Sequence, residues 1–324
     1  MYNYILFSNR ISTVNSIERL NPEIPTLILL RGLSRSYKSW MSLPEELSEY
    51  FNVICIDLPG VGLSANEEPL FSIQDIAKKM LEVINYINPE KIFFVSPSIS
   101  AMITLELVQL LPLEKIKGLV LMSPSHSGVG LKRLTPFAIK VLSTSPMVSK
   151  ETKVKNLYQM MVGKLETGDE LELVNPERYQ KWAEYMLEDE NTMGIKGQIA
   201  QSFSAISYTS LKGLEYIRLN EIPTRFLIPT NDRMIPVAHM EKVYTHINNE
   251  NSELIYMKRC GHDIVTTHQE RLKEIIINLV NDSPNISRSN IPETIIQKKS
   301  TKKLWILGII FALIIVLRIN KSKH

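Results

Sequence analysis

Three polar residues, each behind an apolar strand-like run, have side chains that together could perform nucleophilic catalysis. Ser98 and Asp232 each follow such a run, and His262 follows the run 252–257 within a glycine-containing loop. A serine hydroxyl becomes a strong nucleophile when a histidine removes its proton and a carboxylate orients that histidine. The order Ser98, Asp232, His262 therefore predicts a catalytic triad. The simpler interpretations are a turn serine, a solvated turn aspartate and a loop histidine without a partner.

The turn around Ser98 has the order that a nucleophile elbow requires. The sequence SPSIS (96–100) lies between a strand-like run and an apolar helix-like segment, and such a turn projects the serine hydroxyl above the sheet. The flanking residues must be small, because strand and helix backbones approach closely there. Ser96 and Ser100 are small, although glycine would leave more space.

An acyl-transfer site also needs backbone N–H groups that stabilise the oxyanion. Ile99 follows the predicted nucleophile at the start of a helix and supplies one such group. Leu33, behind Gly32 in the loop LLRGLSRSYKSW, is expected to supply the second. Asp263 adjoins His262, but its position in the chain is unsuited to contacting the neighbouring imidazole ring.

The elements that would position these residues alternate along the chain. Strand-like runs cover 26–30, 52–56, 91–95, 116–122, 224–229 and 252–257, and helix-like segments cover 72–87, 101–111 and 269–280. Strands that alternate with helices of ten or more residues predict a doubly wound, mostly parallel α/β sheet. Ser72 is the expected N-cap of the first of these helices.

The segment 127–218 has a different composition and separates two parts of the predicted core, 24–126 and 219–281. It is helix-like, rich in Lys and Glu, and contains five of the 13 methionines. An insertion near the carboxyl ends of the strands is where a lid over the site would lie. The alternative is a helical decoration without a role at the site.

Four motifs in this order resemble those of an α/β-hydrolase of the lidded, lipase/esterase-like type. They are the loop LLRGLSRSYKSW, the turn DLPGVGLS (57–64), the elbow SPSIS, and the pair NDRMIP and CGHD. The resemblance covers residues 24–281 and implies a Ser98–His262–Asp232 triad with Leu33 and Ile99 in the oxyanion hole. Arg31 replaces the usual histidine before Gly32. We expect Arg31 to form a structural salt bridge rather than to bind Asp57 or an anionic substrate group.

Composition excludes several classes of protein. Eight of the 37 Lys and Arg, but one of the 34 Asp and Glu, lie from residue 285 onward, so the preceding part carries a formal net charge of −4. This distribution argues against a nucleic-acid-binding domain. Two cysteines form no disulfide framework and are typical of a reducing compartment. No secretory signal is expected, and the predicted chemistry requires no cofactor or metal.

The apolar run 304–317, behind a polar, basic linker (282–303), predicts a C-terminal membrane anchor. Its 14 residues extend about 21 Å as a helix, whereas a hydrocarbon core is about 30 Å thick. Flanking Lys and Arg side chains can reach the headgroups and local thinning can reduce the difference, so a span is feasible. A core helix and an interfacial helix are the alternatives. We expect a single-pass membrane protein whose catalytic domain faces the cytosol.

Together these observations predict a membrane-anchored serine hydrolase that cleaves a carboxylic ester or thioester. The methionine-bearing insertion and the apolar anchor suggest a lipid or acyl substrate, although small soluble esters are also consistent with such a lid. Acyl transfer to an alcohol would use the same triad. The alternative from another class is a non-catalytic binding or scaffold protein of the same fold, tethered to a membrane.

Overall fold

The computed structural model describes residues 3–16, 20–130, 132–163 and 175–283. The predicted anchor 304–317 and all but the first two residues of the predicted linker 282–303 lie outside these ranges. No helix among the described residues has the length and apolar character needed to cross a membrane.

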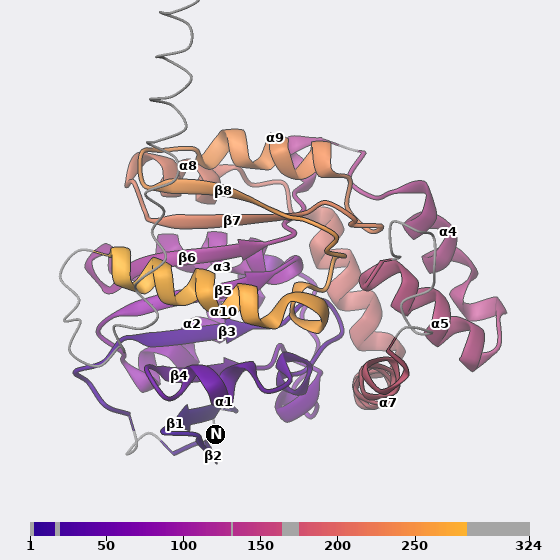
Figure 1. Cartoon of the computed structure of the whole chain (residues 1–324), viewed down its shortest axis with the longest axis horizontal. Coiled ribbons are helices and arrows are strands. Elements are labelled where there is room, and N and C mark those ends of the chain that lie inside the picture. The colour runs from indigo at the N-terminus through magenta and orange to yellow at the C-terminus, as the bar shows by residue number, and fades with distance from the viewer. Residues whose placement is uncertain (1–2, 17–19, 131, 164–174, 284–324) are drawn as a thin grey trace, which may run out of the picture. The chain divides into compact units, whose positions relative to one another are not determined.

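Eight strands form one mostly parallel sheet (Figure 1) in the order β2-β1-β4-β3-β5-β6-β7-β8. The strands are β1 (Ile5–Ser8), β2 (Ile11–Val14), β3 (Thr26–Leu30), β4 (Asn52–Ile56), β5 (Ile92–Pro97), β6 (Ile116–Met122), β7 (Thr224–Pro229) and β8 (Ser252–Met257). The six strands from β3 to β8 run parallel, whereas β1 pairs antiparallel with β2 and β4. All residues of β3, β4 and β5 are buried, as expected for central strands covered on both faces.

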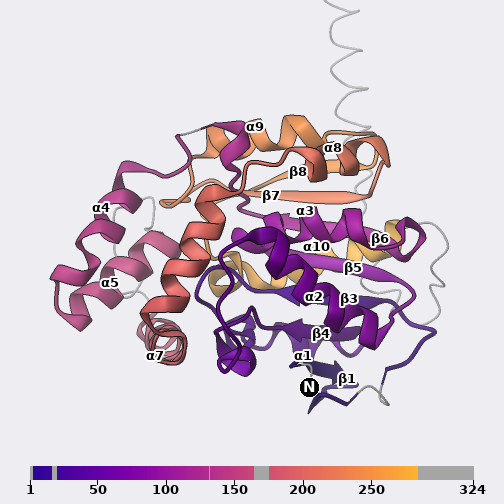
Figure 2. The ribbon, with the colours of Figure 1, turned by 180° about the vertical axis from the view of Figure 1, so that it is seen from behind.

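Helices cover both faces of the sheet. The face in front in Figure 1 carries α1 (Leu43–Leu47) and α10 (Ile264–Asp282), and the opposite face, in front in Figure 2, carries α2 (Ile73–Ile87) and α3 (Ile99–Leu110). Two further helices, α8 (Lys212–Leu219) and α9 (Val237–Ile247), extend that second layer. This arrangement confirms the predicted fold with a mostly parallel sheet between helices.

Several predicted boundaries agree with the structure. Strands 26–30, 52–56, 116–122, 224–229 and 252–257 have the predicted limits, and the Ser72 hydroxyl caps α2 by accepting the Asp75 N–H at 3.2 Å. The hairpin of β1 and β2 was not predicted, because its strands are only four residues long and most of β2 is exposed. Helix α10 begins five residues before the predicted start, and non-helical backbone at His268 explains the difference.

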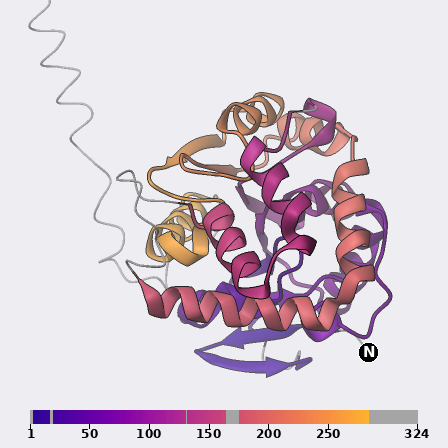
Figure 3. The ribbon, with the colours of Figure 1, turned by 90° about the vertical axis from the view of Figure 1, so that its right-hand side faces the viewer.

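The chain between β6 and β7 forms mainly helices beside the carboxyl ends of the strands (Figures 1 and 3). These helices are α4 (Pro136–Thr144), α5 (Lys150–Met161) and the kinked α7 (Pro176–Ser207), whose backbone is non-helical at Gly194. They contact the loops that follow strands. The Met161 carbonyl accepts the Asp263 N–H at 2.8 Å, and Asp189 accepts the Ser36 N–H at 3.0 Å. The last helix before β7, α8, instead packs against α3.

Candidate active site

Asp232 and His262 form a buried hydrogen-bonded pair. Asp232 Oδ2 lies 2.7 Å from His262 Nδ1, and the side chains are 0% and 3% exposed. Each residue lies in the loop after a strand, Asp232 after β7 and His262 after β8, and these strands are neighbours in the sheet. A neutral imidazole that donates from Nδ1 keeps an unprotonated Nε2, which is the form that can accept a proton.

Backbone groups hold both members of this pair in place. Asp232 Oδ1 accepts the N–H groups of Met234 at 2.7 Å and Ile235 at 2.8 Å, so both carboxylate oxygens are bonded. The His262 carbonyl oxygen accepts the Ser123 hydroxyl at 3.1 Å. A Cβ built on Gly261 would lie 2.3 Å from the carbonyl oxygen of Val162, the residue after α5. The backbone before His262 therefore packs closely against the end of this helix.

Ser98 occupies a strained turn between β5 and α3. Its backbone has φ 52° and ψ −118°, a conformation that residues with a side chain rarely adopt. The residue is 8% exposed. His262 Nε2 is buried and has no hydrogen-bond partner, so the imidazole is not bonded to the Ser98 hydroxyl in this structure. The structure thus joins two of the three predicted residues directly and places the third in an elbow.

The two serines that flank the elbow are fully buried and hydrogen-bonded. Ser96 Oγ and Thr104 Oγ1 lie 2.7 Å apart, and the Ser100 hydroxyl donates to the Arg31 carbonyl oxygen. Both positions therefore accommodate a hydroxyl group where the family pattern has glycine. The Ser100 contact also joins the elbow to the loop after β3.

The predicted oxyanion-hole residues lie on this loop and at the helix start. Ile99 is the first residue of α3, so its N–H has no acceptor one turn earlier in the helix. Gly32, the residue before Leu33, is close to the elbow, because a Cβ built on it would lie 3.9 Å from Ser98 Cβ. Ser34, where glycine is frequent in the family, has φ 58°. Its N–H donates to Gln201 Oε1 of α7 at 2.8 Å.

Arg31 forms a buried ion pair with Asp263 rather than with Asp57. Its guanidinium lies 3.3 Å from both carboxylate oxygens and stacks over Trp40, 4.9 Å from the ring centroid. Asp263 also accepts the Trp182 indole N–H at 3.3 Å. Burial acts to raise the pKa of Asp263, but the charges of Arg31 and Arg35 and the hydrogen bonds to the carboxylate together hold the pKa below its usual value. Asp263 therefore connects two loops and α7 as a structural anion.

Asp57 supports the turn that follows β4. Its carboxylate accepts the Tyr37 N–H at 2.6 Å and the Leu63 N–H at 2.9 Å. Burial raises the pKa of Asp57 to about 7, although these two N–H groups act to lower it. A Cβ at Gly62, whose φ is 54°, would lie 2.1 Å from Asp57 Oδ2. The second glycine of the motif DLPGVGLS, Gly62, is thus required by this carboxylate.

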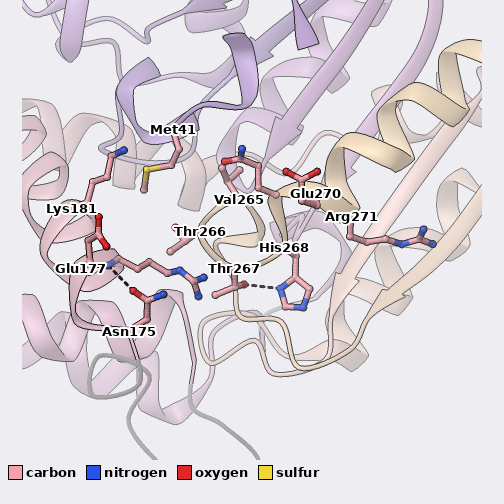
Figure 4. Close-up of a pocket in the computed structure, with 12 residues that line it drawn as sticks. Met41, Asn175, Glu177, Lys181, Val265, Thr266, Thr267, His268, Glu270 and Arg271 are labelled. Carbon is pink, nitrogen blue, oxygen red and sulfur yellow. Dashed lines mark hydrogen bonds between the residues drawn. The ribbon is translucent and has the colours of Figure 1, made fainter. Parts of the chain in front are cut away.

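An open cavity of about 580 Å³ lies between the start of α7 and the start of α10 (Figure 4). Its lining is mostly charged and polar and includes Lys181, His268 and Arg271, but none of Ser98, Asp232 and His262. This cavity is therefore separate from the three residues of the predicted triad. Within the described ranges, no group of three or more His, Cys, Asp or Glu side chains is arranged to hold a metal ion.

Sequence analysis did not single out Arg35, Asp189 or Gln201, which the structure brings to the loop after β3. Asp189 Oδ2 accepts the Ser36 N–H and lies 3.4 Å from the Ser39 hydroxyl. Arg35 stacks over Trp182 of α7, 4.9 Å from the ring centroid. The signal available in the sequence was the presence of two arginines, Arg31 and Arg35, within five residues of the predicted oxyanion loop.

Comparisons with known proteins agree with the fold. A family model described as alpha/beta hydrolase fold matches residues 25–269. A protein from Agrobacterium fabrum (strain C58) named as the carbamate hydrolase RutD is 31% identical over 90 residues, which are 28% of this chain. The chain matches about a third (34%) of that relative's length.

Solved structures share the fold at low sequence identity. The esterase RhEst1 from Rhodococcus sp. ECU1013 superposes with a TM-score of 0.68 at 15% identity, covering 86% of this chain and 94% of that chain. A bromoperoxidase from Bacillus anthracis superposes with a TM-score of 0.67 at 16% identity, covering 86% and 95%. These two similarities concern the fold.

Proposed function

Because the chain belongs to the alpha/beta hydrolase fold family, we propose that it is a serine hydrolase that cleaves a carboxylic ester or thioester. The observation that carries this proposal is the buried Asp232–His262 pair. His262 Nε2 has no hydrogen-bond partner, so it is available to accept a proton. His262 and Ser98 both follow strands of the same sheet. The family match and the hydrolases among its relatives support a hydrolase enzyme.

In the proposed reaction, Ser98 Oγ attacks the substrate carbonyl carbon while His262 Nε2 takes the hydroxyl proton. Asp232 stabilises the imidazolium that forms. The N–H groups of Leu33 and Ile99 stabilise the oxyanion of the tetrahedral intermediate. His262 then gives its proton to the departing alcohol or thiol, and the acyl group stays on Ser98. Water attacks this acyl-enzyme in the same way and releases the acid, whereas attack by an alcohol would transfer the acyl group.

We further propose that residues 127–218 form a lid between the core parts 24–126 and 219–281. The contacts of Asp189 with the loop after β3, and of Trp182 with Asp263, support a role at the site. Both contacts come from α7, so a movement of this helix would alter the loop after β3 and the loop that carries His262.

The apolar run 304–317 remains a proposed tail anchor, joined to the catalytic part by the linker 282–303. Its support is the sequence pattern of an uncharged apolar run with Lys and Arg on both sides. In this arrangement the chain is held at a membrane with the hydrolase domain in the cytosol.

A fluorophosphonate probe tests the central proposal, because it reacts with an activated serine. We expect the wild-type protein to be labelled, Ser98→Ala to remain unlabelled, and His262→Ala to be labelled far more slowly. Labelling that persists in Ser98→Ala would exclude Ser98 as the nucleophile. A folded wild-type protein without labelling and without esterase activity would favour the non-catalytic scaffold.

A further inference from the structure

The Arg35 guanidinium is buried without a hydrogen-bond partner. The residue is 5% exposed, and Nε and both terminal nitrogens are buried and make no hydrogen bond. The side chain lies against the Trp182 ring of α7. A buried cation without hydrogen bonds is strongly unfavourable, and an arginine in this state is a candidate for binding an anion.

The two carboxylates whose charges act on Arg35, Asp263 and Asp189, already accept hydrogen bonds from other donors. Asp263 binds Arg31 and the Trp182 N–H, and Asp189 binds the Ser36 N–H. Their charges favour the charged form of Arg35, whereas burial lowers its pKa to about 10, so the guanidinium stays positive at neutral pH. The two acids therefore stabilise the positive charge of Arg35 without accepting hydrogen bonds from its guanidinium nitrogens.

Other unsatisfied donors lie on the same loop and on the elements that contact it. They are Arg31 Nε and Trp40 Nε1 in the loop after β3, and Gln201 Nε2 on α7. Within this loop, Gly32 lies close to Ser98. The Gly32 carbonyl oxygen also accepts the Arg35 N–H at 3.2 Å. A set of donors without acceptors, on and beside a loop that approaches Ser98 at Gly32, fits a ligand rich in oxygen acceptors.

Three of the five methionines of the insertion are buried, whereas Met147 is 84% exposed. Met160, Met186 and Met193 are 2%, 8% and 5% exposed. Met186 packs with Tyr158 and Trp182, and Met160 packs with Val141, within the apolar clusters of the insertion helices. These three side chains contribute to the packing of the fold and offer no surface to an acyl chain, which weakens the argument from the sequence for a lipid substrate.

We propose that Arg35 binds a carboxylate group on the ester that Ser98 attacks, so that the enzyme prefers small acidic esters to neutral or long-chain ones. A planar guanidinium can bind a carboxylate through two parallel hydrogen bonds. This proposal rests on the proposed serine hydrolase function and names its substrate class. Arg35 then determines specificity and takes no part in the proton transfers.

Two matched pairs of esters test this preference. The first pair is mono-para-nitrophenyl adipate and its methyl-capped, neutral analogue, with the charge on the acyl part. The second pair is para-acetoxybenzoate and its methyl ester, with the charge on the leaving group.

For the wild type we expect a higher kcat/KM for the acidic member of at least one pair. In Arg35→Gln, kcat/KM for that acidic ester should fall about 10- to 100-fold. The neutral ester should change less than about threefold, since it makes no charge-assisted bond.

Arg225→Gln is the matched control, since Arg225 is also largely buried but is paired with Glu253 and Asp282 at the amino end of β7. It should leave the acid preference unchanged. The proposal is overturned if the wild type prefers the neutral member of both pairs, or if Arg35→Gln lowers both members equally. The wild-type comparison holds even if Arg35→Gln fails to fold.

Fluorophosphonate labelling separates the two proposals. Labelling without an acid preference removes only the role of Arg35, whereas absence of labelling removes the proposed hydrolase function itself.

Discussion

Arg31 and Asp263 are 232 positions apart in the chain and form a buried ion pair, with 3.3 Å from the guanidinium to each carboxylate oxygen. The pair joins the loop after β3 to the residue directly after His262. Consecutive residues thus have different partners, since His262 binds Asp232 while Asp263 binds Arg31. The arginine that replaces the usual family histidine therefore has a structural counter-charge in this chain.

The first prediction concerns this ion pair. Asp263→Asn leaves the Arg31 charge buried without compensation, so the free energy of unfolding should fall by about 3–5 kcal/mol. Chemical denaturation measures the change. Glu49→Gln, which removes the partner of the exposed Arg10, is the control and should have no measurable effect. Equal stability of Asp263→Asn and the wild type would show that this ion pair does not stabilise the fold.

The second prediction concerns the orientation of His262. Asp232→Asn should lower kcat for a neutral aryl ester by about 10⁴-fold, because an amide at this position favours the wrong imidazole tautomer. Steady-state kinetics on the purified protein measure this loss, with Asp75→Asn on the exposed face of α2 as the control. A loss below tenfold would remove Asp232 from the triad.

The third prediction concerns the turn after β4. Gly62→Ala should lower the free energy of unfolding by about 2–4 kcal/mol, because the new methyl group overlaps Asp57 Oδ2 and alanine disfavours φ 54°. Gly130→Ala is the control, since its φ of 162° is extended and a Cβ there meets nothing within 4 Å. Thermal and chemical unfolding of both variants decide the comparison, and a similar small effect of the two would contradict the packing argument.

The fourth prediction concerns stability in acid. His126 accepts the Gly128 N–H at Nδ1, and its Nε2 lies 2.9 Å from the Ser210 carbonyl oxygen, an arrangement that suits the neutral ring. Burial lowers the pKa of His126 to about 4 from the ordinary 6.5. Between these values only the unfolded chain binds the proton, so stability is lost as the pH falls from 6.5 to about 4. The loss from this group is roughly 3 kcal/mol.

Denaturation of His126→Gln between pH 7 and pH 4 tests this assignment. The variant should be less stable than the wild type at pH 7 but should lose less stability on acidification. His246→Gln, on an exposed position of α9, should keep the wild-type slope. Parallel slopes for the wild type and His126→Gln would rule out His126 as the source of the acid sensitivity.

The fifth prediction concerns the proposed anchor. The full-length protein should sediment with membranes, whereas deletion of residues 302–324 should release a protein that fluorophosphonate still labels. Cell fractionation and alkaline extraction measure the distribution. Recovery of the full-length protein in the soluble fraction would show that the segment 304–317 is not an anchor.

The sequence by itself determined the positions of most core strands along the chain and the position of the elbow. Local patterns carry this information, because a buried parallel strand is a continuous apolar run and an elbow requires strand, turn and helix in succession. The order Ser98, Asp232, His262 could also be predicted, since the loops after successive parallel strands meet at one edge of a sheet. The four-residue strands β1 and β2 escaped prediction because their apolar alternation is too short to distinguish from a loop.

Only the tertiary structure decided which charged groups are partners. The sequence offers both Asp57 and Asp263 to Arg31, and the choice depends on where two loops meet after folding. The same holds for Arg35, whose lack of a hydrogen-bond partner follows from the positions of Asp189, Asp263 and Trp182. Contacts between residues more than a hundred positions apart leave no periodic trace in the chain, because they depend on packing geometry rather than on local preference.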